Sequence, residues 1–233
     1  MTSAAGRPRI ADAAGKTTID DGTIGLADQM RNRTASLHRD AERSGIVAAL
    51  LRGEADRRSY ALFLRNLLPV YETMEKAFER HRTTPGVRRL VQPDVYRAKA
   101  IAGDLTVLIG DQWRDECPLL PDGMAYVARI DAAADDNGSG LIGHAYVRYL
   151  GDLNGGRILA QRLARMFGTE AARLGAHAFP AIDDLAAFRR DYRTAIDCAG
   201  REIGDVTPAL IEADAAFRLS INLSEAVGAI GRA

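Results

Sequence analysis

Three glycines and a carboxylate lie between residues 145 and 157, in a stretch whose apolar residues recur every three or four positions. This spacing predicts a helix that runs through Gly151, Gly155 and Gly156. Each interior glycine costs a helix roughly 0.5–1 kcal/mol relative to alanine, so the set needs a physical reason. Close packing against another helix, a bend, or a flat ligand against the backbone would each supply one. Asp152, on the same turn, adds a carboxylate to this bare surface and favours a binding site.

His38 is the histidine whose surroundings suggest a metal ligand. The pattern predicts a helix from Leu26 through Ala41. Glu42 falls one turn after His38, where its carboxylate can orient the second ring nitrogen, as it does for metal-bound imidazoles. The remaining histidines have ordinary structural interpretations, at a helix end, at the start of the glycine-containing helix and in a loop: His81, His144 and His177.

A histidine on one helix and a glycine-opened helix facing it suggest a flat, dianionic, iron-bearing ligand between the two, and haem meets that description. Arg189 and Arg193 are one turn apart on a predicted helix, and Arg31 lies two turns before His38. Their guanidinium groups are suited to pair with the propionates of such a ligand.

Two other kinds of centre lack the residues they need. A di-iron site on a helical bundle requires Glu-x-x-His pairs. The residues three positions before the four histidines are instead Ala35, Phe78, Leu141 and Leu174. A cysteine-nucleophile hydrolase has no positive support, because neither Cys117 nor Cys198 has a histidine close in sequence.

The stretch from Tyr146 to Gly156 closely resembles the distal-helix signature of the haem oxygenases. The segment Thr34 to Glu42 looks like the family's proximal-histidine segment. The C-terminal region of the family is similar to Phe188 to Arg193, followed by Thr207-Pro208 and Phe217. The likeness runs from about Leu26 to Ile230. It implies an all-α, single-domain fold with haem between a proximal helix and a kinked distal helix.

The resemblance also implies roles for individual residues. His38 is expected to be the iron ligand, with Glu42 beside it. Asp152 is expected to hold an ordered water network. The expected catalytic residues are Asp152, Arg148, Tyr146 and Gly151. The expected haem-binding residues are Arg31, Glu42, Tyr146, Gly151, Gly155, Gly156, Arg189, Arg193 and Phe217.

The reaction that the resemblance implies is oxidation of haem by dioxygen and reducing electrons to biliverdin, carbon monoxide and ferrous iron. A ferredoxin- or reductase-like protein would supply the electrons. The alternative from another class is a non-catalytic haem-binding or carrier protein on the same scaffold. Asp152 favours the enzyme, because a carrier does not need a carboxylate that orders protons over the distal face.

Four positions depart from the family pattern. Asn154 and Arg157 stand where Ser and Gln are usual, and Ala35 replaces a basic residue one turn before the proximal histidine. Alignment places Leu68, beside Pro69, where many members carry a tyrosine on the second long helix. These changes concern the water network, the propionate contacts and the choice of meso carbon.

The elements that must position these residues all show helical patterns. Besides the two helices above, the spacing predicts helices over about 56–82, 94–112, 124–134, 183–201 and 207–230. Loops are expected at 83–86, 135–140 and 175–180. Without a convincing alternating strand, the class is all-α. We expect one helical domain over 24–233, preceded by a disordered arm over 1–23.

Composition restricts the partners and the location. The 31 basic and 31 acidic residues give a net charge of zero, so no global field attracts nucleic acid or an anionic membrane. The longest apolar run is far too short to anchor the chain in a membrane. Two cysteines are too few for a disulfide framework, which suits a reducing compartment. The sequence therefore predicts a cytoplasmic protein.

Overall fold

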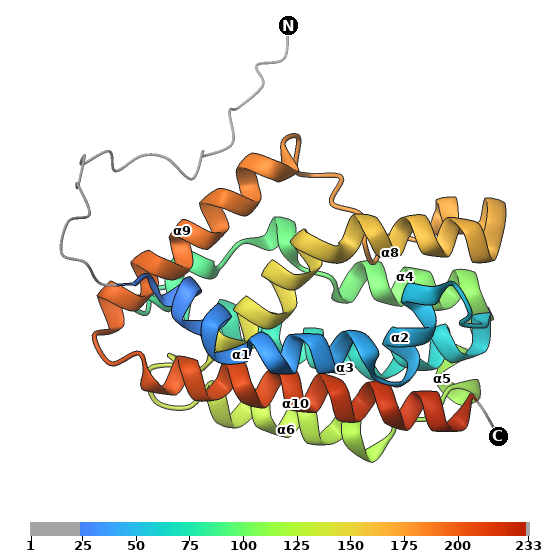
Figure 1. Ribbon diagram of the computed structural model, residues 1–233, viewed down its shortest axis with the longest axis horizontal. Coiled ribbons are helices and arrows are strands. Elements are labelled where there is room, and N and C mark those ends of the chain that lie inside the picture. Colours follow the sequence, from blue (N-terminus) through green and yellow to red (C-terminus); the bar gives the residue numbers. More distant parts are fainter. Residues whose placement is uncertain (1–23, 232–233) are drawn as a thin grey trace, which may run out of the picture.

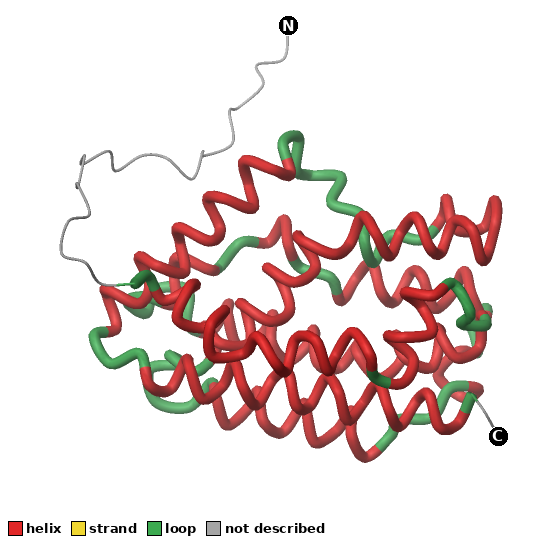
Figure 2. The backbone as a smooth tube through the Cα atoms, viewed as in Figure 1, coloured by secondary structure: helices red, strands yellow, loops and turns green. Residues whose placement is uncertain are grey.

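The computed structural model describes residues 24–231, and this part of the chain contains helices and loops but no strand (Figures 1 and 2). The predicted all-α class is confirmed. The arm expected to be disordered, residues 1–23, lies outside the described residues. The elements in order are α1 (Leu26–Arg43), α2 (Gly45–Arg52), α3 (Arg57–Arg80), η1 (Val87–Leu90), η2 (Pro93–Val95), α4 (Ala98–Ile109), α5 (Trp113–Glu116), α6 (Pro121–Ala133), α7 (Leu141–Ala145), η3 (Tyr146–Leu150), α8 (Gly151–Phe167), η4 (Gly168–Arg173), α9 (Leu185–Ile203) and α10 (Thr207–Ile230).

Helix ends follow local signals where those signals are strong. The last helix has the predicted bounds, with Pro208 in its first turn, where a missing N–H does no harm. Ser44 is extended and separates α1 from α2, at a Ser-Gly pair of the kind that interrupts helices. The helix expected over 94–112 is shorter, and the difference has a tertiary cause. The Glu75 carboxylate accepts the N–H groups of Arg97 and Ala98 at 2.6 and 2.9 Å, which fixes the start of α4.

The long helix α10 lies alongside α6 and α1 and also packs against α2 and α7 (Figure 1). Two glycines allow these close approaches. A β-carbon on Gly143 in α7 would lie 2.4 Å from the carbonyl oxygen of Ala209, and one on Gly228 would lie 2.8 Å from the Cα of Gly45. Helix α10 therefore supports both the start of the glycine-containing helix and the short helix that follows α1.

Helix α9 is held against the start of α1. The Asp197 carboxylate accepts a hydrogen bond from the N–H of Ala27 at 2.8 Å. A β-carbon on Gly200 would lie 2.9 Å from the Leu26 side chain, so these two helices approach closely. This contact brings Arg193 of α9 beside Asp28 of α1, close to Arg31.

None of the helices within residues 24–231 combines the length and the apolar composition that crossing a bilayer requires.

Candidate functional site

The glycine-containing helix is continuous from Leu141 to Phe167, but one turn of it is widened. Residues Tyr146–Leu150 form a π-helical turn immediately before Gly151. Such turns bend helices and are frequent at functional sites. The ribbon changes direction along this stretch (Figure 1). The bend, which was one of the three explanations for the glycines and is also implied by the resemblance, is therefore present, and a π-helical turn accompanies it.

The three glycines have different surroundings. A β-carbon on Gly151 or Gly155 would meet no other atom within 4 Å, so both face open space. A β-carbon on Gly156 would lie 3.3 Å from the carbonyl oxygen of His177. Chain packing accounts for the missing side chain at Gly156. Open space beside Gly151 and Gly155 is what a flat ligand against the backbone requires.

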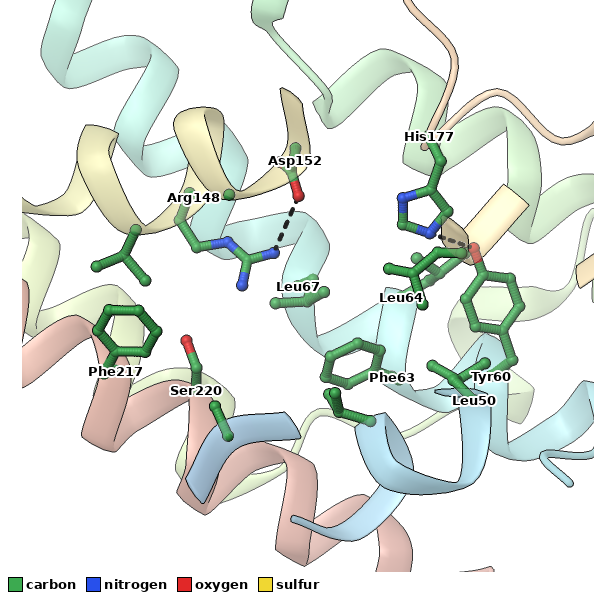
Figure 3. A pocket seen from close by; sticks show the side chains of 15 residues that line it. Leu50, Tyr60, Phe63, Leu64, Leu67, Arg148, Asp152, His177, Phe217 and Ser220 are labelled. Atoms are coloured by element: carbon green, nitrogen blue, oxygen red, sulfur yellow. Dashed lines mark hydrogen bonds and ion pairs between the residues drawn. The ribbon is translucent and has the colours of Figure 1, made fainter. Parts of the chain in front are cut away.

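A cavity of about 180 Å³ adjoins Gly151 (Figure 3). Its walls come from α1, α2, α3, η3, α8, α10 and the loop after η4. The lining residues are mostly apolar: Ala41, Val47, Leu50, Tyr60, Phe63, Leu64, Leu67, Val147, Arg148, Gly151, Asp152, Leu159, His177, Phe217 and Ser220. Ligand sites of this kind combine apolar walls with a few placed polar groups. Here two of the predicted catalytic residues, Arg148 and Asp152, supply polar groups in the wall.

A tyrosine of α3 joins Arg148 and Asp152. The hydroxyl of Tyr71 donates a hydrogen bond to Oδ2 of Asp152 and accepts hydrogen bonds from Nε and Nη2 of Arg148 at 3.1 and 2.7 Å. Nη2 of Arg148 lies 3.9 Å from Oδ1 of Asp152. Burial opposes the charge of Arg148, but Tyr71 and Asp152 together raise its pKa, so the guanidinium stays protonated.

Leu68, which alignment places where many family members carry a tyrosine, is buried in α3, and a nearby tyrosine of the same helix reaches the site instead. Tyr71 lies three residues later on the same face of α3 and reaches Asp152. The sequence pattern placed Tyr71 in the core, and it is 2% exposed. A signal was available, because a buried tyrosine hydroxyl usually needs a hydrogen-bond partner.

His38 of α1 does not line the cavity, and 60% of its side chain is accessible. Its Nδ1 is 3.7 Å from Oε1 of Glu42. The ring of Phe217 lies edge-on to the imidazole, with ring centroids 5.8 Å apart. Phe217 lines the cavity, and so does Ala41, one turn after His38. The structure thus brings together the three predicted residues His38, Glu42 and Phe217.

A second group of predicted residues gathers around the π-helical turn. Arg193 of α9 pairs with Asp28 of α1 at 2.6 Å. Burial raises the pKa of the half-buried Tyr146 phenol, whereas the nearby charges of Arg193 and Arg31 act to lower it. Arg189 is exposed one turn before Arg193 and forms no ion pair within residues 24–231. Arg193 and Arg31 thus place two positive charges near Tyr146, and no contact places Arg189 beside them.

The substituted family positions lie away from the cavity. Asn154, Arg157 and Ala35 are exposed. They do not line the cavity, which leaves Gly151, Asp152 and Arg148 in place. Sequence reasoning missed two other cavity residues, His177 and Tyr60, whose paired side chains come from a loop and from α3.

The residues present fit an iron porphyrin. The glycine backbone leaves room for a flat face, the cavity beside Gly151 is mostly apolar, and the accessible imidazole of His38 contacts Phe217, which lines that cavity. The positive charges near Tyr146 suit two carboxylates.

Comparison with known proteins agrees with this geometry. A family model described as Heme oxygenase matches residues 24–226. Heme oxygenase 1 of Synechocystis sp. is 30% identical over 201 residues, which is 86% of this chain and 84% of the relative. Heme oxygenase of Guillardia theta is 32% identical over 199 residues, covering 85% and 84%. The crystal structure of the Synechocystis enzyme in complex with heme superposes with a TM-score of 0.84 at 29% identity, covering 90% of this chain and 95% of that chain.

Proposed function

The chain belongs to the haem oxygenase family, an enzyme family that degrades haem, and from this premise we propose that it cleaves haem with dioxygen and reducing electrons to biliverdin, carbon monoxide and ferrous iron. The observation that carries the proposal is the Asp152 carboxylate, held by Tyr71 and Arg148 in the wall of an otherwise mostly apolar cavity beside Gly151. A haem carrier does not need such a group.

Asp152 can act on protons through water. One of its oxygens accepts from Tyr71 and the other faces Arg148 at 3.9 Å. A carboxylate has about four acceptor positions, so some remain for water. Arg148 and Tyr71 hold the carboxylate in one orientation, and the water it binds is then aimed into the cavity. In this proposal Asp152 orders the proton supply without itself binding iron.

His38 is proposed as the iron ligand, with Glu42 orienting its ring. When bound, haem supplies both the iron that activates dioxygen and the porphyrin edge that is oxidised. An imidazole ligand donates less electron density than the thiolate of enzymes that favour O–O cleavage. The open backbone at Gly151 and Gly155 lets the distal helix approach the haem face and restrict the space above it.

Arg31, Arg189, Arg193 and Tyr146 are proposed to hold the haem propionates. The electrons are proposed to come from a ferredoxin- or reductase-like protein. The sequence contains only two cysteines, which favours a reducing, cytoplasmic location for this reaction.

The test is a titration of the protein with hemin, followed by addition of reductant and dioxygen. We expect a Soret band on binding, then loss of that band with formation of a bilin. Asp152→Ala should still bind haem but make no bilin. Asn154→Ala, an exposed change two residues further along α8, is the matched control and should turn over normally. A wild-type complex that keeps its Soret band and yields no bilin would instead support the haem carrier.

A further inference from the structure

The cavity has a second polar end. Figure 3 shows Arg148 and Asp152 on one side and His177 with Tyr60 on the other, with the apolar side chain of Leu67 between them. Nε2 of His177 lies 3.3 Å from the hydroxyl oxygen of Tyr60. An imidazole and a phenol thus meet in the wall of a mostly apolar space, where a buried polar group costs free energy unless it is hydrogen-bonded.

Two charged side chains from outside the loop fix the backbone around His177. The Asp104 carboxylate accepts hydrogen bonds from the N–H groups of the two preceding residues at 2.6 and 2.9 Å. On the other side, the buried Arg97 guanidinium donates to the carbonyl oxygen of Ala178 and lies 4.1 Å from the centre of the Phe179 ring. Charge-assisted hydrogen bonds are among the strongest in proteins, so the loop holds the imidazole at one place in the cavity wall.

The hydrogen bond to Tyr60 bears on which ring nitrogen carries the proton. Among the described residues, the buried hydroxyl of Tyr60 has Nε2 of His177 as its one partner, and a buried phenol O–H without an acceptor is costly, which favours donation from Tyr60 to Nε2. A neutral ring that accepts at Nε2 carries its own proton at Nδ1. Nδ1 is buried and has no hydrogen-bond partner among the described residues. An unpaired buried donor is costly, and water in the cavity would pair with it.

Burial disfavours a positive charge on this ring. Burial lowers the pKa of His177, and the positive charges of Arg148 and Arg97 act in the same direction. Asp152 acts in the opposite direction, which places its negative charge within electrostatic reach of the imidazole.

The cavity has room to connect the two ends. Its volume is about 180 Å³, whereas one water requires roughly 10–15 Å³ of such space. Water there would have a donor at His177 and acceptors at Asp152. We propose that His177 is a positioning residue. Its Nδ1–H holds one end of a chain of cavity water, and the Asp152 carboxylate holds the other end of that chain. This inference rests on the proposed function, because ordered water matters only if protons are consumed beside Asp152.

The first test does not use turnover. Nitrogen NMR of the full chain labelled at histidine, without haem, should show His177 as the neutral tautomer protonated at Nδ1. Asp152→Asn should shift that Nδ1 resonance, whereas the resonances of His81, outside the cavity, should not move. A ring protonated at Nε2, or an Nδ1 resonance that ignores Asp152→Asn, would overturn the proposal.

The second test uses haem. His177→Phe keeps an aromatic ring but removes the donor, so haem affinity should stay within about twofold while kcat for bilin formation falls about tenfold, the equivalent of one hydrogen bond. His177→Asn offers an N–H near the position of Nδ1 and should recover most of that loss. Normal turnover by His177→Phe would overturn this inference and leave the proposed function intact. A wild-type protein that makes no bilin would contradict the proposed function, whereas the NMR result would still report on Nδ1.

Discussion

The hydroxyl of Tyr71 lies between the carboxylate of Asp152, to which it donates, and the guanidinium of Arg148, from which it accepts at 3.1 and 2.7 Å. This contact joins α3 to the glycine-containing helix across 81 residues of sequence. The tyrosine is 2% exposed and the side chains of Arg148 and Asp152 are each 14% exposed, so the three groups are largely sheltered from bulk water. Hydrogen bonds in such an environment are strong when complete and costly when broken.

Tyr71→Phe is expected to weaken both the fold and the reaction. The change leaves Arg148 with only the more distant Asp152 contact at 3.9 Å. Loss of a partner from a buried charged group should lower the free energy of unfolding by about 1–3 kcal/mol. Bilin formation should slow about tenfold, because Asp152 loses one of the groups that orient it. Urea denaturation and single-turnover absorbance measure the two effects.

Tyr192→Phe is the matched control for that prediction. Tyr192 is also almost fully buried, at 1% exposure, and its hydroxyl has no hydrogen-bond partner among the described residues. Removal of this hydroxyl breaks no hydrogen bond and relieves an unpaired buried donor, so it should not lower the unfolding free energy and should leave turnover unchanged. Equal losses of unfolding free energy and turnover in Tyr71→Phe and Tyr192→Phe would show that the effect comes from the general repacking that follows any buried Tyr→Phe change.

The position of Tyr71 also shows where sequence reasoning reaches its limit. Leu68 and Tyr71 are three residues apart on one face of α3, and both are buried. Helical periodicity cannot distinguish two such positions, because each belongs in the core by the same rule. Only the packing of α3 against the distal helix decides which of them faces Asp152.

Local signals predicted more of the fold. Thr207-Pro208 marked the start of α10, and the Ser-Gly pair at 44–45 marked the end of α1. A bend and a bare surface for a flat ligand were two of the explanations for the glycines, and the π-helical turn and the open space at Gly151 agree with them. The place of His177 was not predictable, because Asp104 and Arg97, 71 and 81 residues from their partners, determine it.

Alanine substitutions should affect stability differently at the three glycines. Gly151→Ala and Gly155→Ala put a methyl group into open space, so the haem-free protein should gain up to about 1 kcal/mol of stability from helix propensity. The same methyl groups should weaken haem binding about tenfold by crowding its face. Gly156→Ala meets the His177 carbonyl at 3.3 Å and should show no such gain in stability. Thermal unfolding without haem and haem titration are the measurements. Unchanged haem affinity in Gly151→Ala would argue against a haem face lying on the backbone at Gly151.

His38→Ala should remove the proposed iron ligand without destabilising the chain. The side chain is 60% exposed, so the unfolding free energy should change by less than about 0.5 kcal/mol. The Soret band of the haem complex should shift or vanish, and added imidazole should restore it. His81→Ala is the opposite control, since its buried ring bonds to the carbonyl oxygen of Ala134 at 2.8 Å. That variant should lose about 1–3 kcal/mol of stability and keep the Soret band.

Protein stability should fall as the pH drops below about 6.5. His144 is fully buried, and burial lowers its pKa, with Arg129 acting in the same direction and Glu212 against it. The unfolded chain takes up this proton near the ordinary value of 6.5, whereas the folded chain takes it up only at lower pH. The stabilisation by the neutral His144 ring is therefore complete above the pKa of this ring in the unfolded chain. It is lost as the pH falls to the pKa of the ring in the folded chain.

Urea unfolding at about pH 7.5 and about pH 5.5 should show this loss, with a slope of up to about 1.4 kcal/mol per pH unit for each proton. His144→Gln can still donate to Glu212, which lies 3.1 Å from the imidazole, but it does not titrate. Its slope should be shallower than that of the wild type. Identical slopes in the two proteins would show that another group carries the pH dependence.

Asp28 should compete with haem for Arg193. The two side chains pair at 2.6 Å, and the Asp28 hydrogen bond raises the pKa of Arg193. If Arg193 binds a propionate, it must leave Asp28 or share its charge. Asp28→Asn should then tighten haem binding by about threefold, in keeping with the small energies of exposed ion pairs. Arg193→Ala should weaken binding about tenfold, the strength of one charge-assisted hydrogen bond.

The competition predicts a specific non-additivity, since Asp28→Asn can help only through Arg193. In the Arg193→Ala background, Asp28→Asn should leave haem affinity unchanged. Hemin titrations of the four proteins at low salt provide the cycle, and repetition at high salt should shrink every difference, because exposed charges are screened. If Asp28→Asn tightens haem binding equally in both backgrounds, Asp28 acts by its own charge on the propionates, and Arg193 does not hold them.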